Sequence, residues 1–98
     1  MPRERLRLAD YKVPGGKLVR IRLLEKDGNI TTVTITGDFF LIPEDSLPGM
    51  EKMLQGTQLR EEEVRQKIGL FFGSTRVQTL GVSADDFAKA ILSSRTVD

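Results

Sequence analysis

The sequence contains no cysteine, no histidine and no tryptophan. Without cysteine the chain has no disulfide, no thiolate nucleophile and no cysteine-ligated metal site. Without histidine it has no imidazole general base, no Ser-His-Asp triad and no histidine zinc site. Catalysis would have to depend on carboxylates, lysines, hydroxyls or Tyr11. We therefore expect a protein that has no metal site and no catalytic apparatus of its own.

Long hydrophobic runs are also missing. No apolar stretch approaches the roughly 20 residues that a membrane-spanning helix needs, and the opening MPRERLRLADYK lacks the apolar segment of a secretory signal. The 98 residues, 39% apolar and 30% charged, have the length and composition of one globular domain with a modest core. We expect no membrane partner and, by default, a cytoplasmic location.

The formal net charge of +1 conceals an uneven distribution. Residues 1–30 contain eight basic and four acidic side chains, whereas residues 31–63 contain two basic and seven acidic ones. Such asymmetry favours electrostatic steering toward a partner over a uniform nucleic-acid surface. Within the basic third, the side chains that we expect to contact a partner or phosphate groups are Lys12, Lys17, Arg20 and Arg22.

A β-hairpin is predicted over residues 17–36. The alternation in KLVRIRLLE, residues 17–25, is typical of a half-buried strand, and the β-branched segment ITTVTIT predicts a second one. Between them Asp27-Gly28 is a strong signal for a type I′ turn, whose two central residues both need positive φ.

The apolar run that follows is interrupted at Gly37-Asp38. A type II′ turn there would return residues 39–42 as a third antiparallel strand, which is the interpretation we favour. The alternative is a bulge or a strand end, with the phenylalanines packed in a loop. In both cases Gly37, Asp38, Phe39 and Phe40 are expected to be structural, as turn and core.

A second glycine-rich segment precedes the hairpin. Pro14-Gly15-Gly16 has the composition of a turn, so we expect Gly15 and Gly16 to be structural. An anion-binding loop in VPGGK is the weaker hypothesis, because the segment precedes a strand and lacks the spacing of a Walker loop. Residues 1–12 are charged with scattered apolar positions and are expected to form an N-terminal arm.

Three helices are predicted after the strands. Ser46 or Asp45 caps the first, and acidic side chains at the start of the second favour the helix dipole. The third begins with a capping box at Ser83 and Asp86. We assign these acidic side chains to helix starts rather than to metal binding or acid–base chemistry.

The order of elements predicts an α+β domain over residues 13–94, followed by a tail at 95–98. In this fold three helices cover one face of a small antiparallel sheet, made of the hairpin and the short third strand.

The run KVPGGKLVRIRLLEKDGNITTVTITGDFFLIPEDSLPGMEKMLQG resembles the C-terminal accessory domain of lipoate-protein ligases. In that domain a glycine-rich lead-in enters a strand, a DG hairpin follows, and a GDFF segment precedes a helix that ends in Leu-x-Gly. The later LGVSADDFAKAIL is similar to the domain's closing helix. The resemblance covers roughly residues 12–92 and lies in the ordered combination rather than in any single motif.

The resemblance implies a fold similar to the iron–sulfur scaffold proteins of the SufE/NifU-like (IscU/SufE) kind, although a chain without cysteine is not expected to assemble clusters. It further implies a non-catalytic accessory subunit of a two-part, archaeal-type ligase. The large catalytic subunit then handles ATP, Mg²⁺ and lipoate, forms lipoyl-adenylate and transfers the lipoyl group to an acceptor-domain lysine. This chain is expected to bind no cofactor alone and to supply no catalytic residue. The alternative is a nucleic-acid- or protein-binding module that shares only the fold.

Overall fold

A computed structural model describes residues 3–97 of the chain. The elements are, in order, β1 Arg5–Lys12, β2 Leu18–Lys26, β3 Asn29–Gly37, β4 Phe40–Ile42, the 3₁₀ turn η1 Glu44–Ser46, α1 Leu47–Leu54, α2 Glu61–Ser74, β5 Gln78–Leu80, α3 Ala84–Leu92 and β6 Arg95–Thr96. Four strands form an antiparallel sheet in the order β3-β2-β1-β6, while β4 and β5 form a separate two-stranded ribbon. The predicted α+β class is confirmed.

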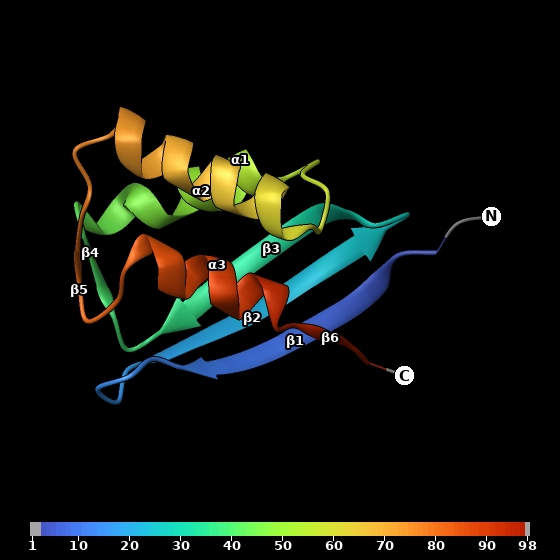
Figure 1. Ribbon diagram of the computed structural model, residues 1–98, viewed down its shortest axis with the longest axis horizontal. Helices are drawn as coiled ribbons and strands as arrows, with labels where there is room; N and C mark the ends of the chain where they lie inside the picture. The colour runs from blue at the N-terminus through green and yellow to red at the C-terminus, as the bar shows by residue number, and fades with distance from the viewer. Residues whose placement is uncertain (1–2, 98) are drawn as a thin grey trace.

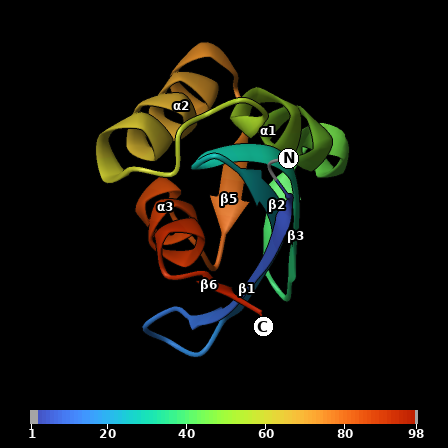
Figure 2. The ribbon, with the colours of Figure 1, turned by 90° about the vertical axis from the view of Figure 1, so that its right-hand side faces the viewer.

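The three helices lie on one face of the four-stranded sheet and leave the other face uncovered (Figures 1 and 2). Helix α3 packs on β1 and β2, α1 packs on β3, and α2 lies against the two other helices. The β4–β5 ribbon closes one end of the molecule (Figure 1). In the part of the chain that the structure describes, no helix has the length and apolarity needed to cross a membrane.

The predicted hairpin is confirmed. Strands β2 and β3 pair antiparallel, with one irregularity in register between Leu24 and Glu25. Asp27 and Gly28 have φ values of 53° and 81°, which is the positive-φ pair that a type I′ turn requires. The capping box is confirmed as well, because the Ser83 side chain accepts from the Asp86 backbone N–H and the Asp86 carboxylate accepts from the Ser83 N–H.

The core lies between the sheet and the helices. It is built from the alternate, inward-facing positions of the hairpin and from one side of each helix. Its most completely buried large side chains are Val19, Ile21, Leu23, Ile30, Ile35, Met50, Leu54, Val64, Ile68, Phe87 and Ile91.

The expected N-terminal arm and C-terminal tail are wrong for the described residues. Residues 5–12 are strand β1, which lies between β2 and β6, and the tail contributes β6. The inward face of β1 carries Arg7 where a strand pattern calls for an apolar residue. Its guanidinium donates to the side chain and backbone carbonyl of Ser94, and its Nη1 lies 3.3 Å from Glu25 Oε1. Residues distant in sequence therefore stabilise Arg7 at an inward position, and the sequence lacks the apolar alternation that would have predicted the strand.

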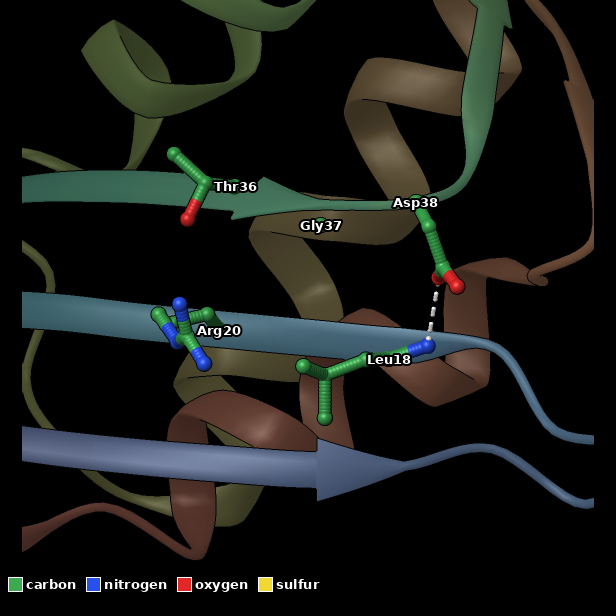
Figure 3. Close-up of a pocket in the computed structure, with 5 residues that line it drawn as sticks. All are labelled: Leu18, Arg20, Thr36, Gly37 and Asp38. Carbon is green, nitrogen blue, oxygen red and sulfur yellow. Dashed lines mark hydrogen bonds between the residues drawn. The ribbon is translucent and has the colours of Figure 1, made fainter.

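The third strand exists, but its predicted partner is wrong. Strand β4 pairs with β5, in the register Phe40 to Leu80 and Ile42 to Gln78, and not with the hairpin. At Gly37-Asp38 the chain leaves the sheet instead of folding back along it (Figure 3). The pairing to a segment about forty residues away has no local sequence signal, whereas a turn glycine has a strong one.

The outer edge of the sheet at β3 is covered by a side chain of α1. The backbone N–H of Ile35 donates to Glu51 Oε2 over 2.7 Å. We expect Glu51→Ala to lower the free energy of unfolding by about 1–2 kcal/mol, because a partly buried strand amide loses a charged acceptor. Urea denaturation measures this loss. The control is Glu4→Ala at an exposed position, whose free energy of unfolding should stay within about 0.5 kcal/mol of that of the unmodified protein. Equal losses in both variants would contradict the role given to Glu51.

Candidate functional site

The uncovered side of the four-stranded sheet is the candidate site, and we call it the open face. Because Val19, Ile21 and Leu23 point into the core, the alternate positions of β2 and their register partners point outward. The open face consists of Leu6, Leu8, Asp10 and Lys12 of β1, Leu18, Arg20, Arg22 and Leu24 of β2, Thr32, Thr34 and Thr36 of β3, and Arg95 of β6.

Two arginines flank an exposed leucine in one row across the open face. Leu8 is opposite Arg22 on one side and Arg95 on the other, and 42% of its surface is exposed. The neighbouring row holds Asp10 and Arg20, whose Oδ1 and Nε lie 2.9 Å apart. That pair is largely exposed, so it contributes little to stability.

Two shallow hollows meet at Arg20. One, of about 300 Å³, is lined by Leu18, Arg20, Thr36, Gly37 and Asp38 (Figure 3). The other, of about 380 Å³, is lined by Leu8, Ala9, Asp10, Arg20, Ile21 and Arg22. Arg20 therefore stands between two depressions, from which its guanidinium can reach a bound group in either one.

The corner at Gly37-Asp38 bounds the first hollow. The Leu18 N–H donates to Asp38 Oδ1 over 2.7 Å, as Figure 3 shows, and the Asp38 N–H points back to the Leu18 carbonyl over 3.4 Å. A Cβ on Gly37 would lie 2.1 Å from that carbonyl oxygen, so the backbones of β2 and β3 approach too closely here for any side chain at position 37. Both residues are therefore structural, as expected, but they form a corner at which the chain leaves the sheet and not a turn that folds it back as a neighbouring strand.

Three of the four predicted contact residues, Lys12, Arg20 and Arg22, come together on the open face. Lys17 does not join them, because its side chain lies over Gly81, where an added Cβ would be 2.9 Å from Lys17 Cγ. Arg95 is a fourth cation on this face that the sequence did not indicate. It follows the end of a helix after two intervening residues, in a strand of only two residues, and no alternation is visible there.

The two phenylalanines after the corner have different environments. Phe39 is half-buried and packs edge-on against Phe87, with ring centroids 5.1 Å apart. Phe40 is 59% exposed, so the expectation that it belongs to the core is wrong. With Ile42 and Leu80 it forms an exposed apolar surface on the ribbon, which we call the ribbon patch.

Gly15 and Gly16 form the turn between β1 and β2. Both have φ near 103°, a conformation that favours glycine. The turn is closed by hydrogen bonds from the Val13 N–H to the Lys17 carbonyl, 2.7 Å, and from the Gly16 N–H to the Val13 carbonyl, 3.0 Å.

The acidic side chains at the start of α3 take part in structural contacts. Asp85 accepts a hydrogen bond from Arg65 of α2 and lies 3.0 Å from Lys89 Nζ. The Arg65 hydrogen bond, followed by that of Lys89, lowers the pKa of Asp85, and the same contacts raise the pKa values of Arg65 and Lys89. Within residues 3–97 no three acidic side chains are grouped to hold a metal ion.

Comparison with known proteins agrees with this fold. A family described as the C-terminus of bacterial lipoate protein ligase matches residues 9–91. Lipoate-protein ligase A subunit 2 of Thermoplasma acidophilum is 40% identical over 75 residues, which are 76% of each chain. A chain from the solved structure of an archaeal lipoylation system, a bi-partite lipoate protein ligase and its E2 lipoyl domain from Thermoplasma acidophilum, matches with a TM-score of 0.73 and 32% identity, over 93% of this chain and 97% of that one. The protein described here therefore belongs to the family of lipoate-protein-ligase C-terminal domains.

Proposed function

We propose that this chain is the non-catalytic accessory subunit of a two-part lipoate-protein ligase. It acts with a large catalytic subunit in the ATP-dependent adenylation of lipoate, ahead of lipoyl transfer to a lysine of an acceptor domain. The observation that carries the proposal is a double match: residues 9–91 match the family described as the C-terminus of bacterial lipoate protein ligase, and 76% of the chain is 40% identical to a polypeptide named lipoate-protein ligase A subunit 2.

In this proposal the chemistry belongs to the partner. The catalytic subunit binds ATP, Mg²⁺ and lipoate, and the accessory subunit docks beside the adenylate site. Docking excludes water and orders the loops that enclose the intermediate. The free-energy cost of ordering these loops is therefore met on docking and not during each turnover. Lys12, Arg20 and Arg22 supply positive charge for the encounter.

The test is lipoyl-adenylate formation from lipoate and ATP by a catalytic subunit from the same organism, measured with and without this protein. We expect adenylation to depend on both chains and to saturate at an equimolar ratio. A catalytic subunit that neither binds this chain nor responds to it would overturn the proposal. Steeply salt-dependent binding to random-sequence RNA or DNA would then favour the nucleic-acid module instead.

A further inference from the structure

We propose that the open face of the sheet is the surface that binds the catalytic subunit, and that the subunit presents there an acidic surface with interspersed apolar side chains. This inference rests on the proposed function, because it names the surface through which an accessory subunit acts. It also separates Lys17 from the contact residues and adds Arg95 to them.

The composition of the open face differs from that of an ordinary solvated sheet. One face of an antiparallel sheet is commonly solvated, and its outward positions are then polar. Here four of the outward positions are leucines, at residues 6, 8, 18 and 24, and no helix covers them (Figure 2). Leu8 is 42% exposed, and the other three are half-buried among their neighbours. Apolar area of this kind gains free energy when a partner removes it from water.

The charge of the open face indicates the partner's sign. Four cations, Lys12, Arg20, Arg22 and Arg95, share the face with one carboxylate, that of Asp10. Among residues 3–97 only Arg20 of these four forms an ion pair. The charges of the others are thus available to carboxylates of a partner, which arginine can bind through two parallel hydrogen bonds.

The same composition favours a protein over a nucleic acid. Surfaces that bind single strands combine cations with aromatic rings on which bases stack. The open face has no aromatic residue, and Tyr11 of β1 is at an inward position opposite Val19. The chain's isoelectric point of about 8.1 is also below that of typical nucleic-acid-binding domains. Leucine interspersed with arginine instead resembles the apolar, arginine-enriched centre of protein interfaces.

The ribbon patch is the competing surface. Phe40, Ile42 and Leu80 are exposed, but Lys17, whose side chain lies over the neighbouring Gly81, is a single cation beside them, so this patch indicates a partner's charge much less strongly than the four cations of the open face. The ribbon patch lies at the end of the molecule and not on the four-stranded sheet. Substitutions in the ribbon patch and in the open face therefore distinguish the two candidate interfaces.

The decisive experiment measures the affinity of the catalytic subunit for variants of this chain by titration calorimetry. We expect R22E/R95E to weaken binding by about 10- to 100-fold, since two charges are reversed at an interface that depends on them. Adenylation should fall at low accessory-subunit concentration and recover at high concentration. The matched control is R76E, which reverses an exposed arginine in the link between α2 and β5 and should bind like the unmodified protein.

Each outcome decides a different question. If the unmodified protein neither binds nor activates the catalytic subunit, the proposed function itself fails, and this inference with it. If it binds and R22E/R95E binds equally well with an unchanged melting temperature, the open face is not the interface. Loss of binding in F40S/L80S alone would assign the interface to the ribbon patch. If R22E/R95E disrupts only self-association, seen by sedimentation, or only RNA binding, the occupant is a second copy or a nucleic acid and the inference is wrong.

Discussion

Replacing Gly37 by alanine is expected to lower the free energy of unfolding by about 3 kcal/mol, near the upper end of single-substitution effects. The added Cβ would lie 2.1 Å from the carbonyl oxygen of Leu18 and 3.1 Å from its carbonyl carbon. Both are backbone atoms, so relief requires the ends of β2 and β3 to separate. That movement breaks the 2.7 Å hydrogen bond from the Leu18 N–H to Asp38.

Urea denaturation of the purified variant measures this loss. The matched control is Gly69→Ala, at an exposed position inside α2 where an added Cβ meets nothing within 4 Å. There alanine should stabilise the protein by about 0.4–1 kcal/mol, because it reduces the freedom of the unfolded chain. Opposite signs at the two glycines are the prediction, and a neutral Gly37→Ala would show that the corner is not closely packed.

The sequence was sufficient for those parts of the fold that rest on local interactions. The turn at Asp27-Gly28 needs two residues with positive φ, and the box at Ser83 and Asp86 needs one side chain at each end of a helical turn. Both requirements are met within four consecutive residues, so the pattern is visible without tertiary information.

Strands β1 and β6 and the ribbon pairing were not predictable in the same way. Arg7 is accepted on the inward face only because Glu25 and Ser94, far away in sequence, satisfy its donors. Phe40 was expected in the core whether residues 39–42 formed a third strand of the sheet or a loop. Once β4 pairs with β5, the alternation turns Phe39 toward Phe87 and Phe40 toward solvent.

The candidate site was predictable only where it depends on local strand alternation and not on the pairing of distant strands. Arg20 and Arg22 share a face because any strand alternates, and the sequence shows this directly. Lys12 joins them only through the pairing of β1 with β2, and Arg95 only through β6. The basic third of the sequence therefore indicated a charged region, while its boundary depended on the sheet topology.

Replacing Phe87 by alanine is the other change with a large expected effect, a loss of about 3–5 kcal/mol in the free energy of unfolding. The Phe87 ring is completely buried. It contacts Phe39 edge-on at 5.1 Å and stacks on Phe72 at 6.1 Å, so it joins α3 to α2 and to the corner before β4. The total free energy of unfolding of such a domain is only about 5–15 kcal/mol, so the melting temperature of the variant should be far below that of the unmodified protein.

The same chemical change at an exposed ring provides the control. Phe40→Ala should alter the free energy of unfolding by less than about 0.5 kcal/mol, because Phe40 is mostly in water already. Equal losses in Phe40→Ala and Phe87→Ala would contradict the assignment of Phe40 to the surface.

Coupling between the two regions can be measured with the milder Phe87→Leu, which largely conserves volume and should cost less than about 1.5 kcal/mol. Phe39 is the common neighbour, because its ring packs on Phe87 and its Cδ1 would lie 3.2 Å from a Cβ on Gly37. The double variant with Gly37→Ala should therefore lose less than the sum of the single variants, by about 0.5 kcal/mol or more. Strict additivity would mean that the corner and the α3 core are energetically independent, and that Phe39 does not transmit strain between them.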